Sequence, residues 1–364
     1  MDTILCGDAL EVLRGMADQS VNCCVTSPPY WGLRDYGTAE WEGGDPGCQH
    51  TISAKDADNK AVFNERVTRG NRDRCVKCGA IRVDHQFGLE ETPEEYVESI
   101  VEVFREVRRV LRDDGTVWLN LGDSYASGKG TCYNPGGGKS SLGKERKDAG
   151  AHPLDRGNKS TLAASGLKPK DLVGIPWRVA FALQADGWWL RSDIIWAKPN
   201  PMPESVRDRC TKSHEYIFML SKSKKYYYDA DAIKEPSVYP NDKRRPLGSK
   251  GAWEMDGREQ RANGGGVAYE HDTLKRNKRD VWKVTTKPFK GAHFAVFPPD
   301  LIRPCVLAGC PKGGTVLDPF FGAGTTGMVA KQEGRKYIGI ELNPEYAEMA
   351  KNRIHRECSM DRLI

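Results

Sequence analysis

Short apolar stretches alternate with longer amphipathic ones along this chain. Stretches that are rich in β-branched and aromatic residues and end at turn residues are typical of buried strands. On this basis the sequence predicts strands at Thr3–Cys6, Val21–Thr26, Thr116–Leu121, Asp193–Ala197, Tyr216–Leu220, Thr315–Asp318 and Tyr337–Glu341.

Helical periodicity occupies several of the intervals between these strands. The clearest helix is predicted at Pro93–Arg112, where Thr92 and Glu95 can form a capping box and apolar residues recur every three or four positions. Similar patterns predict helices at Pro176–Ala185 and at Pro344–Glu357. Strands that alternate with helices predict an α/β fold, doubly wound, with a mostly parallel sheet covered on both faces.

Three polar segments interrupt this alternation, at Tyr36–Phe87, Ser124–Lys170 and Ser223–His293. They are too long to be simple connections between neighbouring elements. We therefore expect them to be functional insertions.

The composition limits the class of protein. The chain has 364 residues, of which 38% are hydrophobic, and a formal net charge of +5. An anionic partner must then be met by local basic clusters rather than by an overall field. No stretch approaches the roughly 20 apolar residues that span a bilayer, and the N-terminus has no secretory pattern. We expect a cytoplasmic protein without membrane contact, whose 11 cysteines are thiols or metal ligands.

A glycine-rich turn, TVLDPFFGAGTTG at Thr315–Gly327, joins a predicted strand to the start of a helix. Its glycines let a ligand approach the backbone, and the helix N-terminus offers free amides. About 20 residues further on, the next strand ends in Glu341, where doubly wound folds place an acid against ribose hydroxyls. An aromatic pair precedes the glycines, so the turn departs from the dinucleotide fingerprint. It predicts an adenosine ligand without a pyrophosphate.

A stiff turn, VTSPPYWG at Val25–Gly32, follows the second predicted strand. Its two consecutive prolines forbid helix and further sheet pairing. The turn therefore presents the Ser27 hydroxyl, unpaired carbonyls and the rings of Tyr30 and Trp31. These groups suit a flat ligand that carries hydrogen-bond donors, and ordinary core packing is the alternative for both rings.

These segments together resemble the DNA amino-methyltransferases. DPFFGAGTTG is similar to the AdoMet-binding motif of that family, and TSPPY is similar to its catalytic motif. GDAL at Gly7–Leu10, IIWAKPNPMPES at Ile194–Ser205 and HFAVFPPDLI at His293–Ile302 also resemble family segments. The catalytic motif precedes the AdoMet motif, as in the β class of that family.

The resemblance implies a seven-stranded, Rossmann-like, AdoMet-dependent methyltransferase sheet with a circularly permuted motif order. The implied activity is transfer of a methyl group from S-adenosyl-L-methionine to the exocyclic amine of a base flipped out of double-stranded DNA. The catalytic residues would be Ser27, Pro28, Pro29 and Tyr30. The cofactor-binding residues would be Asp8, Asp318, Phe320, Gly322, Gly324, Thr326 and Glu341. The target-base pocket would include Trp31, Trp196 and Lys198.

The residue at position 27 bears on the target base. In this family, serine at this position of the motif is most often found in enzymes that methylate cytosine N4. Aspartate is usual in those that methylate adenine N6. We therefore expect methylation of cytosine N4, with adenine N6 as the alternative. The Pro28 carbonyl and the Ser27 hydroxyl would hold the amine in line with the methyl group. Asp8 has an alternative role as the cap of the following helix.

Four candidate metal ligands lie in the first polar insertion. CVKCG has the knuckle spacing that zinc favours, and a cysteine–histidine pair, GCQH, lies upstream. The candidates are Cys48, His50, Cys75 and Cys78. We expect a structural zinc, whose binding would stabilise the folded state of an insertion that lacks an apolar core. His85 is an alternative fourth ligand, and free surface thiols are the alternative to a metal site.

Basic residues are concentrated between the base-pocket segment and the AdoMet segment, where this family has its target-recognition region. We expect them to neutralise phosphates and, in a few cases, to contact guanine edges. The candidates are Arg207, Arg209, Lys212, Arg244, Arg245, Arg276 and Arg279.

We accordingly divide the chain into a catalytic part (1–35 and 88–222), a zinc-binding insertion (36–87), a target-recognition region (223–292) and an AdoMet-binding part (293–364). The resemblance suggests a homodimer and a cognate restriction endonuclease as protein partners, in bacteria or their viruses. A zinc-dependent DNA-binding module without catalysis and an NAD-dependent oxidoreductase are the rival classes. The intact catalytic motif argues against the first, and the absence of a pyrophosphate cradle argues against the second.

Overall fold

The computed structural model describes residues 2–32, 40–51, 74–83, 86–126, 132–133, 166–237, 275–287 and 296–359. Its centre is an eight-stranded sheet in the order β1-β14-β13-β2-β5-β9-β8-β12. The strands are β1 (Thr3–Cys6), β2 (Val21–Thr26), β5 (Leu111–Leu121), β8 (Trp189–Ala197), β9 (His214–Ser221), β12 (Val281–Lys283), β13 (Thr315–Asp318) and β14 (Lys336–Glu341). The pairs β5–β9 and β9–β8 are antiparallel and the other pairs are parallel. Within this sheet, β9 therefore runs against the other described strands.

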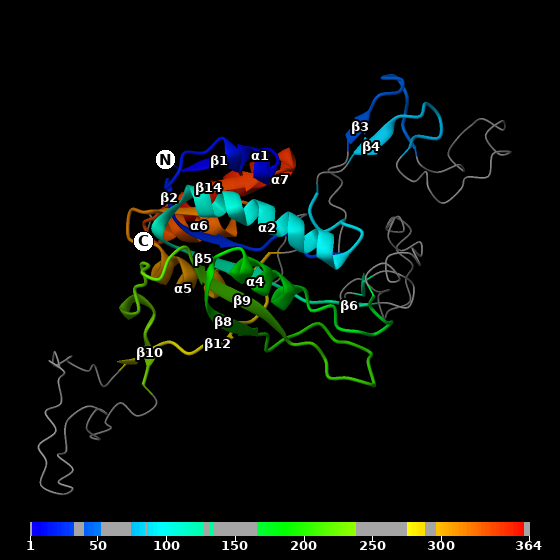
Figure 1. Ribbon diagram of the computed structural model, residues 1–364. Coiled ribbons are helices and arrows are strands. Elements are labelled where there is room, and N and C mark those ends of the chain that lie inside the picture. Colours follow the sequence, from blue (N-terminus) through cyan, green and yellow to red (C-terminus); the bar gives the residue numbers. More distant parts are fainter. Residues whose placement is uncertain are drawn as a thin grey trace, which may run out of the picture.

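Helices cover both faces of the sheet (Figure 1). One apolar core is shared by α1 (Ala9–Arg14), α2 (Pro93–Val110) and α4 (Ile175–Ala185). The other is shared by α5 (Pro299–Gly309), α6 (Thr325–Gln332) and α7 (Pro344–Ser359). The predicted capping box of Thr92 and Glu95 starts α2, and the Asn343 side chain accepts a hydrogen bond from the Glu345 amide at the start of α7. The predicted doubly wound α/β fold is confirmed.

The main sheet differs from the prediction at one edge. The resemblance implied seven strands, and the eighth, β12, pairs in parallel with β8. It comes from the segment 223–292 that was assigned to target recognition. Trp282 packs into the second core, whereas Val281 and Lys283 on either side are exposed. A strand of three residues is too short for its periodicity to identify it.

The strands that precede the two functional turns are neighbours in space. In the register of β2 and β13, Val316 lies opposite Cys23 and Leu317 opposite Cys24. Parallel strands carry their carboxyl ends to the same edge of a sheet. The stiff turn at Val25–Gly32, called the catalytic turn after the motif that it resembles, and the glycine turn therefore leave the sheet side by side, although they lie at opposite ends of the chain.

Three two-stranded sheets lie outside the main sheet. They pair β3 (Glu40–Glu42) with β4 (Ile81–Val83), β6 (Tyr125–Ala126) with β7 (Cys132–Tyr133), and β10 (Glu235–Pro236) with β11 (Lys275–Arg276). Figure 1 shows β3 and β4 together, apart from the main sheet at the upper right. Within the described part of the chain, no helix combines the length and the apolar character that a membrane crossing needs.

Candidate active site

One buried carboxylate joins the catalytic turn to the glycine turn. Asp318, the last residue of β13, is 2% exposed. Its Oδ1 accepts hydrogen bonds from the Thr26 hydroxyl at 2.6 Å and from the Phe320 amide at 3.1 Å, and its Oδ2 accepts one from the Thr326 hydroxyl at 2.7 Å. Thr26 ends β2 immediately before Ser27. These bonds therefore pin the start of the catalytic turn to the glycine turn and to the first turn of α6.

The environment of Asp318 also changes its ionisation. Burial raises the pKa of Asp318 from 3.8 to about 6, against hydrogen bonds from Thr26, Thr326 and Phe320 that lower it. Because both carboxylate oxygens are occupied by protein donors, Asp318 supports the glycine turn from inside the fold. A direct contact of Asp318 or Thr326 with the cofactor stays a prediction.

The glycine turn has the backbone shape that its sequence predicts. Gly322 and Gly324 have φ of 49° and 73°, in the left-handed region that favours glycine. A Cβ on Gly324 would lie 2.8 Å from the Ala350 Cβ in α7. Glu341 accepts hydrogen bonds from the amides of Gly322 at 2.7 Å and Asn343 at 2.9 Å. Its carboxylate thus lies against the turn, and its contact with a nucleoside stays a prediction.

Two other predicted cofactor residues have contacts inside the protein. The Phe320 ring meets the Phe87 ring edge-on, with 5.3 Å between centroids. Asp8 caps α1, where its Oδ1 accepts hydrogen bonds from the amides of Leu10 at 2.9 Å and Glu11 at 3.0 Å. The structure thus shows the capping role of Asp8, and its cofactor role stays a prediction.

Contacts from other segments hold the catalytic turn. The Tyr96 hydroxyl, on α2, donates to the Pro29 carbonyl at 2.9 Å. The Gly32 amide donates to the Gly88 carbonyl at 2.8 Å. The Pro28 carbonyl has no hydrogen-bond donor among the residues that the structure describes. It is the acceptor that the sequence assigns to the substrate amine.

A polar network surrounds the Tyr30 phenol. The hydroxyl donates to Glu215 Oε2 at 2.9 Å, and Asn120 Oδ1 lies 3.2 Å away. Lys198 Nζ donates to the other Glu215 oxygen. Burial, helped by the Glu215 carboxylate, raises the pKa of Tyr30 well above its usual value, so the phenol stays protonated. The Ser27 hydroxyl lies 3.5 Å from the same phenol oxygen.

Sequence reasoning identified neither Asn120 nor Glu215 as a site residue. Asn120 is a polar residue inside the apolar run VWLNL, and Glu215 is the second residue of β9. A polar side chain near the end of a buried strand is the signal that was available. The pairing of β5 with β9 was not predicted. It sets Asn120 opposite Ile217, two residues from Glu215, and so brings the side chains of Asn120 and Glu215 together.

The tryptophans assigned to the base pocket are buried. Trp31 is 6% exposed and its indole donates to the Glu90 carbonyl at 2.9 Å. Trp196 is 4% exposed and its indole donates to the Val284 carbonyl at 2.8 Å. Trp31 packs in the apolar core, and the base-pocket role of both tryptophans stays a prediction. Lys198 Nζ lies 4.4 Å from the centroid of the Trp196 ring.

Most of the described basic candidates have acidic or backbone partners. Arg209 pairs with Glu204 at 2.6 Å and stacks on Tyr125. Lys212 donates to the Asp123 carbonyl. Arg276 and Arg279 both pair with Glu235, at 2.9 and 2.7 Å. Arg207 is exposed. Arg244 and Arg245 lie outside the described residues.

Comparisons with known proteins agree with this arrangement. The model of a DNA methylase family, N6_N4_Mtase, matches residues 21–352. The chain belongs to the N6/N4 DNA methylase family. The type II methyltransferase M.Cfr9I of Citrobacter freundii is 44% identical over 361 residues, which cover 98% of this chain and 88% of the relative. The type II methyltransferase M.SmaI of Serratia marcescens is 44% identical over 353 residues, which cover 97% and 90%.

Among solved structures, the PvuII DNA methyltransferase (cytosine-N4-specific) has the same fold. The TM-score is 0.55 at 16% identity, over 99% of this chain and 92% of that one. Family membership confirms the predicted class of enzyme, a DNA amino-methyltransferase, and the likeness to PvuII confirms its fold.

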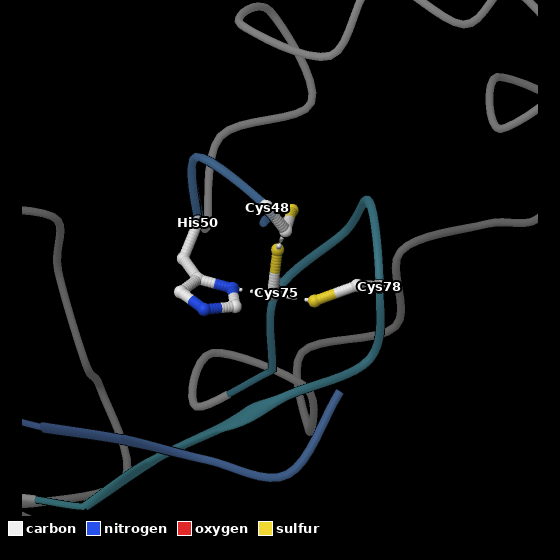
Figure 2. Close-up of side chains that lie close together, drawn as sticks. All are labelled: Cys48, His50, Cys75 and Cys78. Atoms are coloured by element: carbon white, nitrogen blue, oxygen red, sulfur yellow. Dashed lines mark hydrogen bonds between the residues drawn. The ribbon is translucent and has the colours of Figure 1, made fainter. Parts of the chain in front are cut away.

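The four predicted metal ligands of this methyltransferase come together in one cluster (Figure 2). Their ligand atoms all lie within 4.8 Å of one another. Cys48 Sγ is 3.9 Å from Cys75 Sγ, and Cys78 Sγ is 3.2 Å from His50 Nδ1. Two sulfurs bound to one tetrahedral zinc at about 2.3 Å would be about 3.8 Å apart. The donor set and its spacing therefore fit zinc. His85 lies outside the described residues.

Neighbouring groups shape this cluster. The Thr51 amide donates to Cys75 Sγ at 3.5 Å. The Trp41 ring stacks on His50, with 4.9 Å between centroids. A Cβ on Gly44 would lie 2.8 Å from Cys78 Sγ. The ligands are thus held by a backbone amide, a flat ring and a glycine that leaves room for a sulfur.

The raised pKa of Asp318 makes part of the free energy of unfolding depend on pH. Its carboxyl binds a proton more tightly in the folded chain than in the unfolded chain. The resulting stabilisation is complete below pH 3.8 and declines as the pH rises to about 6, by about 3 kcal/mol. Asp318→Asn keeps a hydrogen-bonding side chain but removes the titration. We expect the wild type to lose stability relative to Asp318→Asn between pH 4 and about 7, as measured by urea unfolding.

Asp300→Asn is the matched control, because the Asp300 side chain is 56% exposed. A difference between wild type and Asp318→Asn that stays constant across this pH range would contradict the assignment.

Proposed function

We propose that this protein transfers a methyl group from S-adenosyl-L-methionine to the exocyclic amine of an everted base in double-stranded DNA, and that the base is cytosine, methylated at N4. The observation that carries the proposal is the hydrogen-bonded link Thr26–Asp318–Thr326. It joins the end of the catalytic strand to the start of the helix behind the glycine turn. Substrate amine and methyl donor would meet across this link.

The glycine turn suits the methyl donor. The left-handed Gly322 and Gly324 leave the backbone open to close approach, and the N-terminus of α6 follows directly. Glu341 would accept hydrogen bonds from ribose hydroxyls. When bound, AdoMet would supply a methyl group on a sulfonium, and Asp8, Phe320 and Thr326 stay predicted contacts.

The catalytic turn suits an aromatic amine. The lone pair of such an amine is delocalised into the ring, so the amine is a poor nucleophile until acceptors hold its N–H groups. The carbonyl of Pro28 would be one acceptor and the hydroxyl of Ser27 another. Pro29 stiffens the turn, and its carbonyl is already bonded to Tyr96. Positioning and electrostatics would therefore provide most of the catalysis.

The base must leave the duplex to reach this turn, at a cost of a few kcal/mol. Tyr30 would stack on the everted base and recover part of that cost. Ser27 rather than aspartate at the head of the turn supports cytosine N4 as the target. Adenine N6 is the alternative, because adenine also presents an amine beside a ring nitrogen.

We further propose that the basic residues between 205 and 293 hold the DNA backbone. Arg207 is exposed, and Arg279 keeps 66% of its side chain exposed while it pairs with Glu235. Both can reach phosphates. Arg209, Lys212 and Arg276, which are less exposed, would shape the surface beneath. The division of the chain into four parts, the bacterial or viral cytoplasm, the homodimer and the cognate endonuclease stay predictions.

A structural zinc in the cluster of Cys48, His50, Cys75 and Cys78 completes the proposal. The metal would tie the segment 48–51 to the segment 74–83, and the short β3–β4 pair joins 40–42 to 81–83 in the same insertion. Few of the described apolar residues in this part are buried, so ligand bonds would stabilise what packing does not.

The identity of the product tests the main proposal. Protein, AdoMet and unmethylated duplex DNA are incubated, the DNA is digested to nucleosides, and the products are identified by mass spectrometry. We expect N4-methylcytosine. N6-methyladenine would show that the target is adenine N6 and not cytosine N4. Unmethylated DNA would contradict the proposed activity. Tyr30→Ala should lower kcat/KM about 10- to 100-fold through lost stacking.

The salt dependence of DNA binding tests the phosphate contacts. Plotted as log association constant against log salt concentration, binding of duplex DNA should fall steeply because counterions are released. Arg207→Ala should reduce the slope by about one. Arg105→Ala is the control, since Arg105 pairs with Asp186 on the α2 side of the fold. An unchanged slope for Arg207→Ala would remove Arg207 from the interface.

Metal analysis tests the zinc site. The purified protein should contain about one zinc per chain, the number that four ligands bind at a structural site. Cys78→Ser should lower the content, whereas Cys210→Ser, at an exposed cysteine outside the cluster, should not. Equal zinc in the two variants would show that the cluster is not the site.

A further inference from the structure

The Tyr30 side chain is held both along its ring and at its hydroxyl. A Cβ on Gly122, just after β5, would lie 2.6 Å from Tyr30 Cε2 and 3.1 Å from Cδ2. The ring therefore packs directly on the backbone at Gly122. At the far end of the ring, the hydroxyl is shared between Glu215 at 2.9 Å and Asn120 at 3.2 Å.

The partners of the phenol are themselves held. Asn120 Nδ2 donates to the Tyr216 carbonyl at 3.0 Å and to Glu215 Oε2 at 3.3 Å. These two bonds turn its Oδ1 toward Tyr30. Asn120, Glu215 and Lys198 come from β5, β9 and the end of β8, which are neighbours in the sheet. Residues of β5 and β9 thus contact the hydroxyl, and Lys198, just after β8, binds Glu215.

Glu215 is a charged group in a place that disfavours charge. Its side chain is 14% exposed, and that of its ion-pair partner Lys198 is 20% exposed. Burial alone would raise the pKa of Glu215, but the ammonium of Lys198, the Tyr30 phenol and Lys212 bring it below its usual value. A carboxylate in this state is a weak proton acceptor. A role for Glu215 as the general base is therefore disfavoured. Its hydrogen bond with Tyr30 indicates a structural role instead.

We propose that Glu215 is a positioning residue, which fixes the Tyr30 ring as the stacking surface for the everted base, with Asn120 and Lys198 in support. This inference rests on the proposed function. The ring of Tyr30 follows two prolines and packs on the Gly122 backbone, and its hydroxyl is held by Glu215. The hydrogen bond to Glu215 sets its plane before the base arrives, so less ordering is needed on binding. Lys198 acts here through Glu215 rather than by touching the base.

A double-mutant cycle tests this assignment. Tyr30→Phe removes the hydroxyl and keeps the ring, and Glu215→Gln removes the charge and keeps the shape. We measure kcat/KM for transfer of labelled methyl from AdoMet to unmethylated duplex DNA. Each single change should lower kcat/KM about 10- to 100-fold, the range for one hydrogen bond to a charged group. The double variant should be no slower than the slower single variant, because Tyr30→Phe removes the hydrogen bond that Glu215→Gln weakens.

Two further measurements separate positioning from a general loss of structure. The Kd for AdoMet, by calorimetry, should stay within about twofold of wild type in each variant, because losses between independent distant sites are small. In protein labelled at the tyrosine Cζ carbons, the ¹³C resonance of Tyr30 should move in Glu215→Gln. Glu94→Gln, which breaks an exposed pair with Arg178, is the matched control. It should change neither the Kd for AdoMet nor the Tyr30 resonance.

The outcomes distinguish the inference from the proposed function. If wild type transfers no methyl group to DNA, the proposed function fails and this inference falls with it. If wild type is active but the losses of the two single changes add in the double variant, the inference alone is overturned. An unmoved Tyr30 resonance in Glu215→Gln would also overturn it. Gly122→Ala should displace the ring independently and lower kcat/KM about as much as Tyr30→Phe.

Discussion

The buried carboxylate of Asp318 is the contact on which the arrangement of the site depends. It accepts hydrogen bonds from Thr26, 292 positions away in the chain, and from Thr326 at the start of α6. Its desolvation is unfavourable, and the two hydroxyls and the Phe320 amide offset that cost only in part, as the raised pKa shows. The parallel pairing of β2 with β13 holds the carboxylate in place. Two turns with different chemistry thus share one rigid support.

The polar groups of the site follow from the same geometry. Both faces of the sheet are covered by helices, so polar side chains on its strands reach a ligand mainly at the edge. Ser27, Asn120 and Lys198 lie at or just beyond the carboxyl ends of β2, β5 and β8. Glu215 joins them because β9 runs in the opposite direction and brings its first residues to that edge. One reversed strand therefore supplies the carboxylate that meets Tyr30.

The cysteine–histidine cluster is organised on a different principle. Its four ligands come from two short segments with little apolar core around them, and Trp41 and Gly44 supply the local packing. The segment that follows leads to Gly88, whose carbonyl accepts the Gly32 amide, and to Phe87, which meets Phe320. The insertion returns to the chain between the two functional turns. The end of the insertion therefore lies next to both turns of the site.

The sequence by itself determined the features that depend on neighbouring residues. Strand boundaries such as Val21–Thr26, the caps at Thr92 and Asn343, the glycine turn and the two short-spaced ligand pairs follow from local conformational preference and short spacing. Only the tertiary structure decided the strand order, the addition of β12, the turning of Asp318 into the interior and the meeting of Glu215 with Tyr30. These depend on which strands pair across the sheet. Pairing is set by the packing of the whole core, and no short stretch of sequence records it.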